Sequence, residues 1–359
     1  AVHFSPVFYL LAPVYYLFPH PQTLLIAQAV VVMSGVIPLY LICKKYNYSN
    51  PVTLGFSIVY LFSTALISPC FYDFHENMFL PPLLMWFFYA AEKKKYVLMY
   101  IMMALVLSVK EDAPLYLICI GLYFVLSNRR KLHGAIIAAI SGGYFVIVTS
   151  LMKKYGEGIM TSRTYGNLMT DTSAGFGNII KTVVTNPGYF VSLLTKEDKL
   201  IFFITMLLPL AFMPLITKRA SRFLVIVPFI VMNLAPDYTY ASKVGYQYVF
   251  GTFVCLLYVT VLNFNDIPKR IRPALISFMA FASVFTAVSG STWKMYTKES
   301  YEINKTKFET MVSYFQMIPD DASVTADTWY VPHLANRKEI YMMRDTDNNF
   351  KYTDFVIVR

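Results

Sequence analysis

Two short clusters of ionisable residues hold the chemistry that the sequence offers. One covers residues 72–76, Tyr-Asp-Phe-His-Glu, and the other covers residues 110–112, Lys-Glu-Asp. Carboxylates beside a histidine are suited to general base catalysis or to holding a divalent cation. A lysine ammonium offsets the charge of a phosphate, and the tyrosines near these clusters offer flat faces to a sugar ring. The clusters therefore predict a site for acid–base or metal-assisted chemistry.

The backbone of the first cluster decides which of its side chains meet. In a helix, Asp73 and Glu76 share a face at i, i+3, whereas in an extended chain Asp73 and His75 do. Either arrangement makes a two-group site, and a divalent metal ion held by Asp73, His75 and Glu76 is one interpretation of it. In the second cluster, Glu111 or Asp112 supplies a further carboxylate.

Each cluster also has a purely structural interpretation. Asp112 precedes Ala-Pro, so it is suited to cap the helix that follows, and Lys110 and Glu111 can neutralise each other. Solvation at the membrane interface, together with capping of a helix that begins near Pro81, accounts in the same way for residues 72–76. The tyrosines are equally typical of an interfacial belt. The sequence leaves these interpretations open beside the functional ones.

The composition is that of a membrane protein. Of the 359 residues, 57% are hydrophobic and 14% are charged, with a mean hydropathy of +0.50, whereas a soluble domain has about a quarter charged residues. These values exclude an ordinary cytosolic enzyme, a disordered chain and a nucleic-acid-binding module. The sequence has no Walker, GxGxxG, GxSxG or HExxH motif, which argues against nucleotide hydrolysis and zinc proteolysis.

Ten apolar runs predict an all-α polytopic fold with about ten transmembrane helices. Crossing a bilayer takes about 20 residues, and fewer where the bilayer is thinned or a helix ends in a cavity. The runs on either side of residues 110–112 are short, so that turn is recessed into the bilayer, where charges need partners or water. The predicted spans are Thr23–Cys43, Val52–Pro69, Met78–Ala91, Tyr96–Val109, Ala113–Leu126, Ala135–Met152, Leu200–Thr217, Phe223–Ala235, Tyr246–Leu262 and Pro273–Ser289.

Positive charge alternates between successive connections. Every second connection is basic, and the positive-inside rule places these connections in the cytoplasm. They are residues 44–45, 93–95, 129–131, 218–222 and 269–272. Both ionisable clusters then lie in outer loops, since the outward-facing loops include 69–77, 109–113 and 153–199.

We expect two domains, a multi-span transmembrane domain at 1–290 and an extracytoplasmic α/β segment at 291–359. The segment Phe4–Phe18, interrupted by prolines, is expected to be a kinked helix at the outer interface. Within the C-terminal segment the expected elements are strands at Ser323–Ala326, Glu339–Met342 and Asp354–Val358, with a helix at Trp329–Leu334.

Several motifs resemble the domain-of-unknown-function family 2079, a family of bacterial and archaeal membrane proteins placed with the GT-C glycosyltransferases. The resemblance extends over most of the chain. It rests on His3-Phe-Ser-Pro with the following Leu-Ala-Pro-x-Tyr, Asp73-Phe-His-Glu, Lys110-Glu-Asp-Ala, Ile318-Pro-Asp-Asp-Ala-Ser-Val, Pro332-His-Leu-Ala-Asn-Arg and Thr353-Asp-Phe-Val.

The resemblance implies a GT-C-like enzyme of the plasma membrane. Such an enzyme moves a sugar from a polyprenyl-phosphate donor to an acceptor on the outer face, with catalytic carboxylates in outer loops. It also implies that a first span and an acidic outer loop precede Ala1, and that the principal catalytic aspartate lies there. Within this chain the expected catalytic residues are Asp73, His75, Glu76, Glu111 and Asp112.

We assign Lys110, Tyr72 and His3 to substrate binding, with Lys110 near the lipid phosphate. The remaining expected partner is the lipid bilayer, and no nucleic acid is expected. Two other classes stay open: a transporter or flippase for a lipid or small solute, and a non-catalytic membrane scaffold. An enzyme requires the ionisable residues to face one outer cavity, whereas a transport pathway continues to the cytoplasmic face.

Overall fold

The computed structural model describes residues 3–128, 130–155, 164–169, 175–290, 298–343 and 353–358. Several positions named above lie outside these ranges. They are Ala1, Arg129 of the third basic turn, 156–163 and 170–174 of the long outer loop, and 291–297, 344–352 and 359 of the C-terminal segment. The chain divides into two compact units, one formed by Ala1–Leu10 with Ala27–Thr292 and the other by Leu11–Ile26 with Trp293–Arg359.

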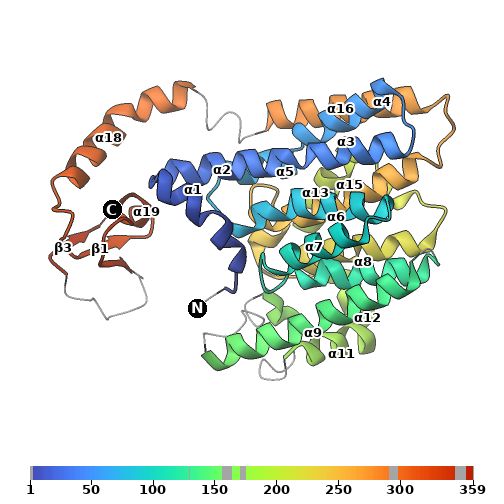
Figure 1. The fold of residues 1–359 in the computed structure, drawn as a ribbon, viewed down its shortest axis with the longest axis horizontal. Coiled ribbons are helices and arrows are strands. Elements are labelled where there is room, and N and C mark those ends of the chain that lie inside the picture. Colours follow the sequence, from blue (N-terminus) through green and yellow to red (C-terminus); the bar gives the residue numbers. More distant parts are fainter. Residues whose placement is uncertain are drawn as a thin grey trace. The chain divides into compact units, whose positions relative to one another are not determined.

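The first unit is built of helices, many of which run roughly parallel to one another (Figure 1). Its α-helices are α3 Val36–Lys45, α4 Asn50–Leu61, α5 Thr64–Cys70, α6 Leu80–Glu92, α7 Tyr96–Leu107, α8 Pro114–Leu126, α9 Lys131–Tyr155, α11 Gly175–Thr185, α12 Pro187–Leu194, α13 Glu197–Leu207, α14 Phe223–Pro228, α15 Phe250–Phe264 and α16 Arg272–Ser289. Helix α2, Pro21–Ser34, begins in the second unit and continues into the first. The short helices that matter for the site are 3₁₀ helices η1 Pro6–Leu10, η2 Glu76–Phe79, η9 Thr239–Ser242 and η10 Gln247–Val249, and a π-helix, η8 Phe229–Leu234.

Several of these helices have the length and composition of membrane spans, as the sequence predicts. Within the described residues, the five long ones are Pro21–Lys45, Asn50–Cys70, Lys131–Tyr155, Gln247–Phe264 and Arg272–Ser289. Shorter apolar helices cover Tyr96–Leu107, Pro114–Leu126 and Ala220–Leu234. The predicted span Leu200–Thr217 is interrupted, because α13 ends at Leu207 and is followed by left-handed backbone at Ala211 and Phe212.

Helices α8 and α9 cross at two glycines. A Cβ atom added to Gly121 would lie 2.7 Å from the carbonyl oxygen of Gly134, and one added to Gly134 would lie 2.5 Å from the carbonyl oxygen of Gly121. Both distances are too short for any side chain, so the absence of Cβ atoms is what lets the two backbones touch. Close approach through small residues is a common way to pack helices in a membrane, where apolar side chains gain nothing by leaving lipid.

Helix α15 is the centre of the first unit, and every one of its residues is buried. Its middle is joined to α3 and α6 by the buried carboxylate of Glu92. This carboxylate accepts hydrogen bonds from Lys45 Nζ at 2.6 Å, Tyr46 Oη at 2.8 Å and Tyr258 Oη at 2.8 Å. Such a satisfied buried charge ties these helices together, because removing Glu92 would leave its buried partners unpaired. The first residue of α15 directly follows η10, and the candidate site lies there.

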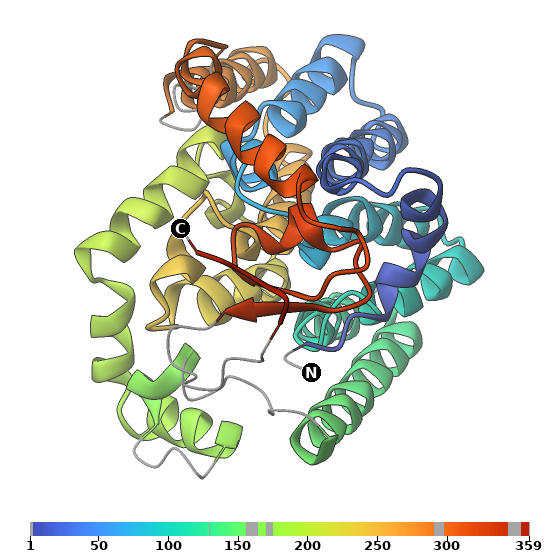
Figure 2. The ribbon, with the colours of Figure 1, turned by 90° about the vertical axis from the view of Figure 1, so that its left-hand side faces the viewer.

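The second unit contains a small parallel sheet of strand order β2-β1-β3 (Figure 2, in red). Val324 of the central strand pairs with Ile340 on one side and Phe355 on the other. One face packs into a core of Ile318, Val324, Ala326 and Leu334. The elements are α1 Ala12–Leu17, α18 Lys298–Gln316, β1 Val324–Asp327, α19 Val331–Leu334, β2 Ile340–Met343 and β3 Phe355–Ile357. All three strands overlap the ranges expected from the sequence.

Asn336 connects the N-terminal residues of the second unit to its C-terminal part. Asn336 accepts a hydrogen bond from Tyr15 Oη at 3.1 Å and donates one from Nδ2 to the carbonyl oxygen of Pro19 at 2.6 Å. The segment Phe4–Phe18, expected as one kinked helix, is instead two short helices, η1 and α1, which belong to different units.

Candidate functional site

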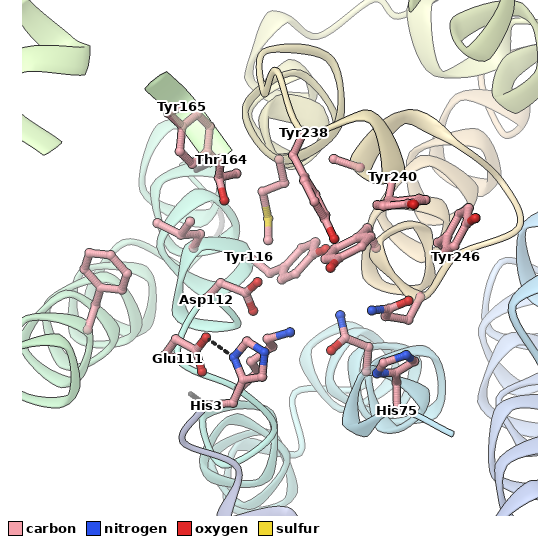
Figure 3. Close-up of a pocket in the computed structure, with 18 of the residues that line it drawn as sticks. His3, His75, Glu111, Asp112, Tyr116, Thr164, Tyr165, Tyr238, Tyr240 and Tyr246 are labelled. Atoms are coloured by element: carbon pink, nitrogen blue, oxygen red, sulfur yellow. Dashed lines mark hydrogen bonds and ion pairs between the residues drawn. The ribbon is translucent and has the colours of Figure 1, made fainter. Parts of the chain in front are cut away.

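A cavity of about 380 Å³ lies in the first unit, where the two ionisable clusters come together. Its walls come from residues 72–77, residues 110–116 at the start of α8, and residues 238–248 before α15. His3, Phe145, Thr164, Tyr165 and Met232 also line it (Figure 3). The volume is within the range of small-molecule sites. Of the residues predicted for the site, the cavity is lined by His3, Tyr72, His75, Lys110, Glu111 and Asp112, while Asp73 and Glu76 do not line it.

Glu111 fixes the N-terminal segment against the cavity. His3 Nδ1 lies 2.7 Å from Glu111 Oε1, and the Phe4 amide donates to Glu111 Oε2 at 3.1 Å (Figure 3). The Val7 amide adds a hydrogen bond to the carbonyl oxygen of Ser108 at 2.9 Å. Burial alone would raise the pKa of Glu111, but His3 and Lys110 outweigh it and hold that pKa below its ordinary value. Glu111 is therefore an ionised group that positions His3.

Lys110 pairs across the cavity wall with Glu76 and not with its neighbour Glu111. Lys110 Nζ lies 2.9 Å from Glu76 Oε1, with both side chains buried, and 5.8 Å from the centroid of the Tyr248 ring. Burial opposes ionisation of both groups, yet the nearby opposite charges raise the pKa of Lys110 and lower that of Glu76. The interpretation that Lys110 and Glu111 only neutralise each other is wrong, because each pairs with a different element.

Asp112 is the carboxylate that points into the cavity (Figure 3). Its Oδ1 is buried and has no hydrogen-bond partner among the described residues. Helix α8 has Ala113 at its N-cap and no side-chain capping bond, so the capping interpretation of Asp112 is wrong. Burial, together with Glu111 and Glu76, raises the pKa of Asp112 to about 6 against the opposing effect of Lys110. A carboxyl group of this kind is suited to accept a proton near neutral pH.

The turn at residues 72–76 is held by Gln28 of α2. Gln28 Nε2 donates to the carbonyl oxygen of Asp73 at 2.8 Å, and Gln28 Oε1 accepts from the His75 amide at 3.0 Å. The Asp73 side chain is exposed and, among the described residues, accepts a hydrogen bond only from the adjacent Phe74 amide, at 2.7 Å. The backbone is extended at His75 and helical from Glu76, and of Asp73, His75 and Glu76 the cavity is lined by His75.

His75 faces the cavity with Nε2 buried and, within the described part of the chain, unpartnered. Its ring stacks on Tyr72 at a centroid separation of 6.1 Å. Burial lowers the pKa of His75, despite the nearby carboxylates, so the imidazole is neutral at pH 7. A neutral imidazole can either donate or accept a hydrogen bond at Nε2.

A metal centre does not fit this arrangement. The described residues contain no group of three His, Cys, Asp or Glu side chains placed to hold a metal ion. Asp73 is exposed and does not line the cavity, and the Glu76 carboxylate is engaged by Lys110. We therefore derive no chemical step through a metal ion at Asp73, His75 and Glu76.

A row of tyrosines forms the opposite wall, and sequence reasoning missed most of it. Consecutive ring centroids are 4.5 Å apart for Tyr72 and Tyr246, 4.6 Å for Tyr246 and Tyr240, and 5.2 Å for Tyr240 and Tyr238. The row ends at Tyr248, 5.7 Å from Tyr238. The signal in the sequence is the repeated Tyr-x-Tyr pattern at 238–240 and 246–248, which lies at the short helices η9 and η10.

The tyrosine wall is positioned by Asn233 of the π-helix. Asn233 Nδ2 donates to the carbonyl oxygens of Ala241 at 2.7 Å and Tyr248 at 3.2 Å. Asn233 Oδ1 accepts from Thr252 Oγ1 at 2.7 Å, and that hydroxyl lies 3.3 Å from Tyr116 Oη. The wider turns of a π-helix commonly occur at functional sites, and here one places a fully buried amide in contact with both η9 and η10.

Comparison with known protein families matches residues 1–358 to a family described as "Predicted membrane protein (DUF2079)". The match covers both units and every residue of the candidate site. The comparisons with curated proteins and with solved structures each found no match.

Proposed function

The chain belongs to the DUF2079 family of predicted membrane proteins, and from this premise we propose that it is a GT-C-type glycosyltransferase of the plasma membrane. The donor is a sugar on polyprenyl phosphate, and the acceptor is bound on the outer face. The transfer takes place in the tyrosine-lined cavity, with Asp112 as the general base.

The proposed topology has ten crossings, with the five basic turns in the cytoplasm. The turns that line the cavity then face outside, as does the C-terminal segment. None of the described residues in the basic turns lines the cavity. This distribution supports a site that opens to one side of the membrane, and it gives no support to a transport pathway that continues to the other side.

The observation that carries the proposal is the Oδ1 of Asp112 inside the cavity, to which the described residues supply no hydrogen-bond partner. In the proposed reaction, Asp112 takes the proton of an acceptor hydroxyl as the hydroxyl oxygen attacks the anomeric carbon. The bond from that carbon to the phosphate oxygen breaks, and polyprenyl phosphate leaves with the electron pair. Asp112 then releases its proton to water. A phosphate is already a good leaving group, so a base and charge stabilisation suffice.

The other cavity residues have supporting roles in this proposal. Lys110, the buried cation of the cavity, stabilises the charge that develops on the leaving phosphate, and Glu76 holds it in place. His75 hydrogen-bonds the sugar through Nε2, and Glu111 positions His3 at the edge of the bound substrate. Tyr72 and its neighbours in the tyrosine wall contact the face of the sugar ring.

The test is a transfer assay in membranes, preceded by native mass spectrometry of lipids retained by the purified protein. We expect a retained polyprenyl phosphate, or its glycosylated form, in wild type and in Asp112→Asn. We expect Asp112→Asn to lose about 100-fold or more in transfer rate, which is the usual contribution of a general base.

The matched control is Asp237→Asn. Asp237 is an exposed aspartate of an outer turn that does not line the cavity, so its variant should transfer at the wild-type rate. Unchanged turnover in Asp112→Asn would refute the assigned base, and retention of bulk phospholipid alone in repeated preparations would refute the lipid-linked donor.

A further inference from the structure

The cavity presents hydrogen-bond acceptors that the protein leaves unsatisfied. Asn77 Oδ1, Asp112 Oδ1 and Gln247 Oε1 are buried in its walls and have no partner among the described residues. The side chains of Asn77 and Gln247 belong to residues only 4% and 6% exposed. Buried polar atoms in folded proteins are nearly always hydrogen-bonded. Three oxygens of this kind around one space can therefore accept several hydrogen bonds from a bound occupant.

The charges around the cavity disfavour a carboxylate on the sugar head group. Three carboxylates, those of Glu76, Glu111 and Asp112, surround one ammonium, that of Lys110, which is already paired with Glu76. His3 is paired with Glu111. No described cation forms an ion pair with Asp112. A carboxylate on the occupant would meet Asp112 without a free counter-charge, and like charges at close range in a buried site are strongly unfavourable.

One further cation lies near the tyrosine wall but outside the cavity. Lys243 is exposed, and its ammonium is 5.7 Å from the centroid of the Tyr240 ring. It does not line the cavity, so it does not balance Asp112. The ring faces themselves favour apolar C–H groups or an ammonium over an anion, because the face of an aromatic ring carries negative charge.

We propose that the cavity selects a polyhydroxylated head group without negative charge, a neutral or amino sugar, and rejects a carboxylated one. This inference rests on the proposed function, and it goes beyond it by naming the class of sugar. Hydroxyl and ammonium groups both supply the donors that Asn77, Asp112 and Gln247 lack. The phosphate of the donor is shared by all candidate sugars, so the selection acts on the head group alone.

The test is a competition between three matched donors, farnesyl-phosphate-linked glucose, glucosamine and glucuronic acid, for the full chain in lipid nanodiscs. Native mass spectrometry measures how much of each remains bound. We expect the glucose and glucosamine compounds to be retained about tenfold or more over the glucuronic acid compound, since the last brings like charges together. Equal or preferential retention of the glucuronic acid compound would overturn the inference and leave the proposed function standing. Retention of none of the three would overturn both.

Two variants test whether the charge of Asp112 causes the preference for the uncharged head group. Asp112→Asn removes the repelling charge and keeps the shape of the side chain, so we expect it to retain the glucuronic acid compound about as well as the glucose compound. Asp237→Asn removes an equivalent charge outside the cavity and should keep the wild-type preference. An unchanged preference in folded Asp112→Asn would show that Asp112 does not set the selectivity. The wild-type competition decides the inference even if Asp112→Asn does not fold.

Discussion

At the scale of single residues, Asp112 keeps a buried carboxylate oxygen for which the described residues supply no hydrogen-bond partner. Such an arrangement reduces folding stability, and native proteins retain it mainly where it serves a function. Glu76 and Glu111 have the same chemistry but are engaged by Lys110 and His3. Among these three acidic side chains, Asp112 is therefore the one free to take part in proton transfer.

The raised pKa of Asp112 predicts a pH dependence of transfer. Burial is the largest cause, and it brings the pKa from 3.8 to about 6. The base acts only when ionised, so kcat/KM should rise with pH through about 6 and stay level up to pH 8. The folded protein binds an extra proton between about pH 4 and pH 6, so this group makes the protein less stable as pH rises through that window.

The measurement is a profile of kcat/KM between pH 5 and pH 8 for wild type, with Asp237→Asn as the control that should reproduce it. A profile without a rise near pH 6 in wild type would contradict the role of Asp112. The residual activity of Asp112→Asn should show no such rise, because the titrating group is gone.

At the scale of elements, the geometry of the site depends on how α8 packs against α9. Asp112 and Tyr116 lie at the start of this helix, and its middle is packed against α9 through Gly121 and Gly134. The contact is between backbones, so no side chain is available to adjust if either glycine is replaced. The orientation of α8, and with it the direction of Asp112, follows from this crossing.

We predict that Gly121→Val separates α8 from α9 and lowers the thermal stability of the protein. The added atoms would lie within 3.0 Å of Gly134 and Ala138, and overpacking of this kind costs about 1–3 kcal/mol or more. Gly142→Val in α9 is the matched control, because a Cβ atom there meets nothing within 4 Å. Thermal melting in detergent compares the two, and an equal melting temperature for both variants would contradict the close crossing.

At the scale of the whole molecule, the alternation of basic and non-basic turns predicts which residues face outside. In intact cells, Lys243→Cys should react with a membrane-impermeant maleimide, whereas Lys93→Cys should react only after permeabilisation. Both lysines are exposed, so accessibility within the fold does not bias the comparison. The unsubstituted protein gives the background from its four native cysteines. The reverse labelling pattern would place the cavity on the cytoplasmic side and refute an outer-face transferase.

Composition and apolar periodicity alone determined that this is a helical membrane protein, because lipid forces long apolar segments to satisfy their backbone hydrogen bonds as helices. Local patterns also located the strands near 324, 340 and 355. The motifs at 72–76 and 110–112 identified where ionisable groups gather, and the order of these motifs along the chain identified the family.

Only the tertiary structure decided which of those groups face a common space. Asp73 and Asp112 look equivalent in the sequence, yet one is exposed and the other points into the cavity. The pairing of Lys110 with Glu76, and of His3 with Glu111, joins residues far apart in the chain. The tyrosine wall depends on Asn233 in a π-helix, whose i→i+5 hydrogen bonds are rare and occur mostly in single turns. Contacts of this kind depend on how helices pack, and local sequence patterns do not record helix packing.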